Sequence, residues 1–141
     1  FMFAGCKNII SINFTSFNTK YITNMNGMFD ECNGLKNINL SNFNTENVTS
    51  MAFMFHECSA LVSLNLSSFD TKKVNNMGYL FNSCKSLENL NLLNFHIQEE
   101  TQYTALFRKC PALKKENIIA HDAKILKCFD NTRLYDDKYD Y

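Results

Sequence analysis

Apolar residues recur along the chain with a period of 26 residues. The recurrence forms ladders in which the same residue type returns at each step: Cys6, Cys32, Cys58, Cys84 and Cys110; Phe3, Phe29, Phe55, Phe81 and Phe107; Phe17, Phe43, Phe69 and Phe95; Met25, Met51 and Met77; Ile9, Leu35, Leu61, Leu87 and Leu113. A fixed period of this length is typical of repeat proteins, in which each unit buries its apolar side against its neighbours. The pattern therefore predicts a stack of similar units.

Each unit predicts one short strand followed by one short helix. In residues 35–60, Ile38 and Leu40 alternate with polar residues, which is the spacing of a strand. In residues 48–58, apolar side chains recur at steps of three and four, which is the spacing of a helix face, and Asn47 is placed to be its N-cap. The equivalent strands are expected near residues 12–14, 38–40, 64–66 and 90–92.

Stacking these units predicts an α/β fold, a leucine-rich-repeat solenoid of strand-turn-helix units. Its parallel sheet is expected on the concave side and its short helices on the convex side, because strands pack closer together than helices do. We assign residues 1–117 to about five units, the first truncated and the last degenerate, residues 118–129 to a C-terminal cap, and residues 130–141 to a polar tail. Since the chain opens within a unit, we expect it to be a fragment of a longer protein.

The last unit departs from the pattern. Ile97 stands where the other units have threonine, and Tyr103 stands where they have methionine. Glu116 falls 26 residues after Leu90, at a position that is apolar elsewhere. These changes predict that the regular stack ends in this region.

The unit resembles the BspA-like leucine-rich repeats, in particular the 26-residue "surface protein" type of bacteria and protists. That pattern is close to LxxLxLSxFxTxxVxxMxxMFxxC, and this chain reads LKNINLSNFNTENVTSMAFMFHEC and LVSLNLSSFDTKKVNNMGYLFNSC. The resemblance covers about residues 1–117, and the ending KKENIIAHDAKIL is similar to the close of protist members. It implies a binding or adhesion array without catalytic residues.

The composition and the missing motifs exclude several classes of function. Lys and Arg number 14, as do Asp and Glu, so the formal net charge is +0 and the chain lacks the basic footprint of a nucleic-acid-binding protein. It has no apolar run long enough to span a membrane. It also has no glycine-rich phosphate loop, nucleophile elbow or paired carboxylates, so we expect neither an enzyme nor a cofactor.

The cysteines allow a disulfide or a metal site as alternatives to buried free thiols. Equivalent positions of stacked units point the same way, which favours free thiols on the inner face. His56-Glu57-Cys58 looks like a ligand cluster but occurs in one unit only. Cys110, His121 and Cys128 lack the spacing of a metal finger, so we expect no metal.

Polar residues of the strands form the candidate binding face. By strand alternation they all point outward, either to contact a partner or merely to be solvated. The members are Asn13, Asn37, Asn39, Ser41, Ser63, Asn65, Ser67, Asn89 and Asn91. Asn, Ser and Thr side chains suit hydrogen bonding to another protein or to a glycan.

Two functions fit this surface: an intracellular protein-binding scaffold and a cell-surface adhesion or recognition protein. Three glycosylation sequons place their acceptor Asn13, Asn39 or Asn65 on the sheet, where glycans would cover the candidate face in a eukaryotic secretory pathway. Unpaired thiols are also more typical of a reducing compartment. Both observations favour the intracellular scaffold.

Overall fold

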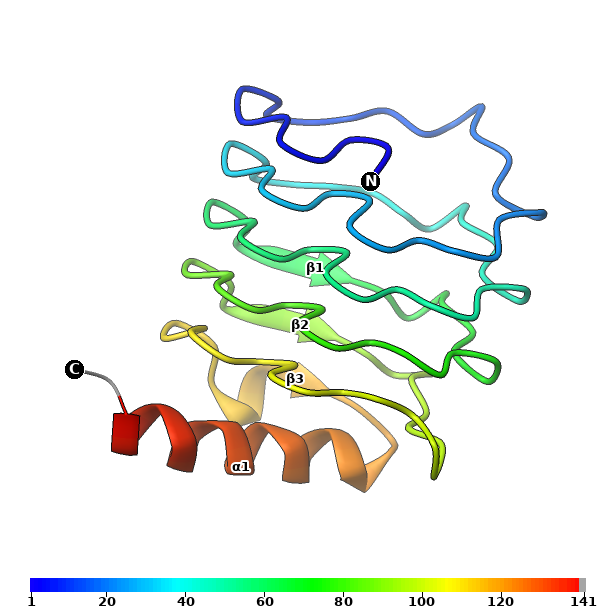
Figure 1. Ribbon diagram of the computed structural model, residues 1–141. Coiled ribbons are helices and arrows are strands. Elements are labelled where there is room, and N and C mark those ends of the chain that lie inside the picture. The colour runs from blue at the N-terminus through cyan, green and yellow to red at the C-terminus, as the bar shows by residue number, and fades with distance from the viewer. Residues whose placement is uncertain (140–141) are drawn as a thin grey trace.

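The computed structural model describes residues 1–139 and arranges successive 26-residue units side by side (Figure 1). The fold mixes α and β structure, and helix α1 lies across the last unit. The elements in chain order are β1 (Ser63–Asn65), β2 (Asn89–Asn91), the 3-10 helix η1 (Lys115–Asn117), β3 (Ile118–Ile119) and α1 (Ala123–Tyr139). No helix among the described residues is long and apolar enough to cross a membrane.

The strands form a parallel sheet in the order β1-β2-β3, as the period predicted. Leu64 pairs with Leu90, and Leu90 pairs with Ile118, so all three point into the core. The equivalent residues 12–14 and 38–40 are not assigned as strands. Their inward side chains, Ile12 and Ile38, are only partly buried, so this end of the sheet is less tightly packed.

The register also corrects the alignment of the last unit. Ile118, and not Glu116, occupies the position that follows Leu90 in the sheet. The step from Leu90 to Ile118 is therefore two residues longer than the usual 26, and η1 accommodates the extra residues just before β3. Glu116 consequently stays exposed, and the buried apolar ladder continues without a charge.

The predicted short helices on the other side of each unit are wrong. Residues 48–58 form successive turns without helix, and alternate N–H groups donate to the following unit. Met51 N donates to Asn76 O at 2.9 Å, and Phe55 N donates to Leu80 O at 3.0 Å. Isolated parallel bridges link the same segments at their start, pairing Asn24 with Ser50, Ser50 with Asn76, and Asn76 with Gln102. We call residues 24–31, 50–57, 76–83 and 102–109 the turn ladder; Figure 1 shows it in front of the arrows of β1 and β2.

The turn ladder needs backbone conformations that a helix never uses. Phe53 has a φ of 58° and Glu57 has a φ of 55°, both in the left-handed region. Asn47, expected as the N-cap, instead donates its side-chain Nδ2 to the Lys20 carbonyl of the preceding unit at 3.1 Å. Alternate N–H groups of this segment are therefore satisfied between units, and the N–H groups between them bond within turns of the same unit, as His56 N does to Phe53 O at 3.1 Å.

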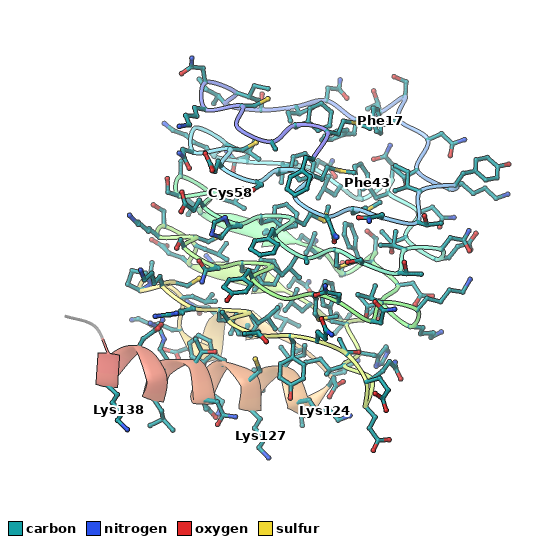
Figure 2. The ribbon with its side chains drawn as sticks, in the orientation of Figure 1. Phe17, Phe43, Cys58, Lys124, Lys127 and Lys138 are labelled. Carbon is teal, nitrogen blue, oxygen red and sulfur yellow. The ribbon has the colours of Figure 1, made fainter. Side chains whose placement is uncertain are left out.

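Aromatic stacks fill the core between the sheet and the turn ladder. In one stack the ring centroids of successive units lie 5.5–6.0 Å apart, through Phe3, Phe29, Phe55, Phe81 and Phe107. A second stack runs through Phe17, Phe43, Phe69 and Phe95 at 6.2–6.4 Å, and Figure 2 labels its first two members. Each ring thus packs on its own copy in the next unit.

Helix α1 ends the core and extends through residues that were predicted to be a polar tail. Phe129 packs edge-on against Phe107, with ring centroids 5.7 Å apart. Arg133 Nη2 donates to the carbonyls of Cys110 and Leu113, both at 2.6 Å. These contacts fix α1 against the last unit, and residues 130–139 of the segment assigned as a polar tail are part of this helix. Residues 140–141 of that predicted tail lie outside the described residues.

Candidate binding surface on the strand face

The nine candidate residues all lie on the solvent side of the strand segments. In β1, Ser63 and Asn65 are exposed on either side of the buried Leu64. In β2, Asn89 is exposed and Asn91 is half-buried around Leu90. The remaining candidates are exposed, apart from the half-buried Ser67. We call the surface formed by these nine residues the strand face.

A row of asparagines on the strand face has a structural role that the alternation pattern did not indicate. Each side-chain Oδ1 accepts a hydrogen bond from the backbone N–H two residues later, which forms an Asx turn at the end of the strand segment. The four bonds, 2.9–3.0 Å long, join Asn13 to Thr15, Asn39 to Ser41, Asn65 to Ser67, and Asn91 to Leu93. The oxygens are thus occupied, and the asparagine side chains share one orientation.

The Nδ2 groups of these asparagines make no hydrogen bond to any described residue. Each amide nitrogen carries two N–H donors, so neighbouring units present a row of donors to solvent. Strands in a sheet lie about 4.8 Å apart, so the row has a fixed spacing. This arrangement suits a partner that offers a series of oxygen acceptors.

Two hollows follow the strand face and share Asn65. One, of about 280 Å³, is lined by Asn39, Ser41, Asn65 and Ser67 together with Ile38, Leu40 and Ser68. The other, of about 430 Å³, is lined by Ser63, Leu64, Asn65, Asn89, Leu90 and Asn91, with Glu116, Asn117 and Ile119 around its end. The hollows thus join seven of the nine candidates, and Asn13 and Asn37 lie outside both. Glu116, Asn117, Ile119 and Ser68 were not predicted as part of the face.

The cysteine ladder lies inside the units, away from the strand face. Cys32, Cys58, Cys84 and Cys110 are fully buried free thiols, whereas Cys6, in the first unit, is only half-buried. The Sγ of Cys58 donates to the carbonyl of Phe29 at 3.1 Å, and Cys84 bonds to Phe55 in the same way at 3.0 Å. Burial raises the pKa of Cys110 to about 12, so this thiol stays protonated and is a poor nucleophile.

His56, close to Cys58 in the sequence, makes a hydrogen bond to the preceding unit. His56 Nδ1 lies 2.8 Å from the Asp30 carboxylate of the preceding unit. The imidazole thus faces a carboxylate and not the thiol. Among the described residues, no group of three His, Cys, Asp or Glu side chains is placed to hold a metal ion.

A further hollow, of about 610 Å³, lies between the last unit and α1. Its walls are Tyr79, Thr101, Gln102, Tyr103, Thr104, Ala105 and Arg108 on one side and Cys128, Asn131 and Thr132 of α1 on the other. No pattern in the sequence indicated it, because it depends on where α1 packs.

The chain matches the model of the family described as "Mycoplasma protein of unknown function, DUF285" over residues 1–120. No curated protein and no solved structure matches it. The matched region includes every ladder of the 26-residue repeat, from Phe3 to Leu113. The chain therefore belongs to the DUF285 family.

Proposed function

We propose that this chain is a non-enzymatic binding module, a solenoid of the BspA-like leucine-rich-repeat type whose strand face holds another protein. The observation that carries the proposal is the row of Asn13, Asn39, Asn65 and Asn91. Their oxygens are used in Asx turns, and their amide N–H groups face solvent. Such a row can donate to several backbone carbonyls of a partner at once.

The chemistry of the face favours many weak contacts over one strong anchor. It has no aromatic residue and, apart from Glu116 at one end, no charge beside the two hollows. Each neutral hydrogen bond adds about 0.5–1.5 kcal/mol, so binding needs several units acting together. An array of similar units supplies several such hydrogen bonds. Such a surface can therefore bind a partner without a hot spot of large side chains.

An intracellular location is part of the proposal, because the core holds five buried thiols that each remain unpaired. Adhesion at a cell surface is the alternative, and the resemblance to surface-protein repeats favours it. The two are separated by finding the natural protein in the soluble or the surface fraction of its cells.

The binding test uses Asn→Asp changes that keep the Asx turns. Asp70 already makes a turn of this kind, with its Oδ1 accepting from Lys72 N at 2.9 Å, so an aspartate can take the place of an asparagine in an Asx turn. The triple variant Asn39→Asp, Asn65→Asp, Asn91→Asp removes the donors and adds negative charge opposite the partner's carbonyls. We expect each single change to alter the unfolding free energy by no more than about 0.5 kcal/mol, and the triple variant to lose about 1–2 kcal/mol more, because carboxylates at paired positions such as Asn65 and Asn91 repel each other. A lysine at these positions would lose the turn as well, so it would be a poorer test.

The readout is the set of proteins retained by the immobilised chain, with affinities then measured for purified candidates. We expect the triple variant to bind about 10- to 100-fold more weakly, which corresponds to losing a few hydrogen bonds. The matched control is Asn44→Asp, whose Oδ1 accepts from Glu46 N at 3.0 Å in an Asx turn away from the strand face. Equal binding by wild type and triple variant would refute the proposal. If the chain binds glycans on a glycan array and retains no protein, the partner of the strand face is a glycan and not a protein.

A further inference from the structure

The turn ladder has a direction, and the last unit exposes its unsatisfied end. In the three preceding units, four alternate N–H groups each donate to carbonyls of the next unit. The donors are Met25, Gly27, Phe29 and Glu31, then Met51, Phe53, Phe55 and Glu57, then Met77, Tyr79, Phe81 and Ser83. The equivalent donors of the last unit are Tyr103, Ala105, Phe107 and Lys109.

The orientation of these last N–H groups follows from the planar peptide bond. The carbonyls of Gln102 and Thr104 accept from the preceding unit, from Met77 N and Tyr79 N, both at 2.8 Å. In a trans peptide the next N–H points the opposite way. The N–H groups of Tyr103 and Ala105 therefore point away from the preceding unit, toward the side on which α1 lies.

One donor of this row shows that the direction is used. Lys109 N donates to the Asp136 carboxylate of α1 at 3.0 Å. The N–H groups of Tyr103 and Ala105 make no hydrogen bond to any described residue. Both residues line the 610 Å³ hollow between the last unit and α1.

We propose that this hollow binds an extended peptide segment whose backbone carbonyls accept hydrogen bonds from the N–H groups of Tyr103 and Ala105. The contact repeats one already present in the molecule, because the carbonyls of Gln102 and Thr104 accept hydrogen bonds from the N–H groups of Met77 and Tyr79 in the same way. It is a form of strand addition, in which main-chain bonds give affinity and side-chain pockets give selectivity. The site is separate from the strand face and does not depend on its function.

The walls of the hollow fit a peptide. Tyr79 and Tyr103 offer aromatic surface, and Asn131 of α1 is an exposed amide that can bond both the N–H and the C=O of a peptide. Its volume lies in the range of pockets that take small ligands, about 300–1,000 Å³. The neighbouring units show that backbone carbonyls with two-residue spacing match this row of donors.

The test follows the two amides in the whole chain by NMR. In the free protein, the amide protons of Tyr103 and Ala105 should exchange with solvent at least about tenfold faster than those of Met77 and Tyr79, whose equivalent bonds are formed. The probe is the acetylated and amidated peptide Gln-Tyr-Thr-Ala, the chain's own residues 102–105. Saturating downfield shifts of both amide protons and slowed exchange are the expected result.

A blocking variant and a matched control lie on the same helix. Asn131→Trp fills the hollow and should lower the affinity for the peptide at least about tenfold. Leu134→Trp, at a position that is 71% exposed and outside the lining, should leave binding unchanged. Slow exchange of both amides in the free protein would overturn the proposal, as would the absence of any shift at millimolar peptide. Shifts produced by acetate or phosphate but not by the peptide would instead identify an anion site and overturn it too.

Discussion

Raising the pH above 9 should destabilise the chain steeply, because its buried thiols stay neutral only in the folded state. Desolvation by burial raises the pKa of Cys32 and Cys128 to about 11 and that of Cys110 to about 12, from an ordinary value of 9.0. The same cause raises the pKa of Cys58 further, and it raises the pKa of Cys84 well above its ordinary value. The thiolate form is thus strongly disfavoured in the core.

The sign and size of the effect follow from proton linkage. Below pH 9 these thiols are protonated in both states and contribute nothing to the pH dependence. Above pH 9 the unfolded chain releases protons that the folded chain keeps, so the free energy of unfolding falls by about 1.4 kcal/mol per thiol and pH unit. By pH 10 the five thiols together remove about 7 kcal/mol, which is comparable to the whole stability of a small domain. For Cys32 and Cys128 the fall ends near pH 11, where the folded form also ionises.

The assay is urea unfolding at a series of pH values from 8 to 10.5, followed by circular dichroism in the presence of a reductant. The informative comparison is with Cys84→Ala, which removes one thiol that is fully buried. The variant starts less stable at pH 8, since it loses the bond to the Phe55 carbonyl. Its slope above pH 9 should nevertheless be shallower by about 1.4 kcal/mol per pH unit. The two proteins differ in no other ionisable group, so an unchanged slope would refute the reasoning.

Two further predictions concern the core and the turn ladder. Phe55→Ala should cost about 3–5 kcal/mol of unfolding free energy, because its fully buried ring lies between Phe29 and Phe81 at centroid distances of 5.5 and 6.0 Å. The control is Tyr21→Ala, at an 80% exposed position, and equal urea midpoints for the two variants would contradict the stacked core. Glu57→Gly should raise the unfolding free energy by about 1 kcal/mol, because glycine adopts a φ of 55° without the strain that a side chain causes. The control Glu46→Gly, at an exposed position without positive φ, should not raise the unfolding free energy. A lower unfolding free energy for Glu57→Gly would count against strain at this position.

The parallel pairing of the strands and the core ladders could be predicted from the sequence because the 26-residue period fixes which residues meet. Leu64 and Leu90 pair in the sheet and Phe55 and Phe81 stack, each with its equivalent in the next unit. The strand face could also be predicted, since alternation around Leu64 is enough to place Ser63 and Asn65 outside. The Asx turns of the strand face were missed, although an asparagine two residues before a backbone donor at a strand end is a typical setting for them.

The turn ladder could not be predicted from apolar spacing, because its inward residues recur at the same steps of three and four as a helix face. The two conformations differ in a residue with left-handed backbone, and the sequence has glycine, the residue that favours this conformation, at only some of these positions. At one such position glycine occurs as Gly5, but the equivalents are Glu31, Glu57, Ser83 and Lys109, all with positive φ. Tertiary contacts between units therefore decide the local backbone, and a single unit carries too little information to show it.

The end of the stack shows why the hollow beside α1 had no local signal. Within the units a buried threonine joins neighbours: Thr71 Oγ1 accepts from His96 N at 2.8 Å and donates to His96 O at 3.2 Å. Ile97 breaks this series, and its partners come instead from α1 and the residue just before it. Asp122 accepts from Ile97 N at 2.8 Å, and Lys124 donates to Ile97 O at 2.9 Å.

Farther along the same edge, α1 again offers groups of the required kind, a cation for carbonyls and a carboxylate for an N–H. Arg133 takes the Cys110 and Leu113 carbonyls, and Asp136 takes Lys109 N. A straight helix cannot follow every step of a turn ladder, because its side chains reach the edge only where its own turns face it. The N–H groups of Tyr103 and Ala105 lie between those points of contact. The hollow is therefore a direct consequence of ending a directional ladder with a helix, and its donors stay available to a ligand for the same reason that the stack stops there.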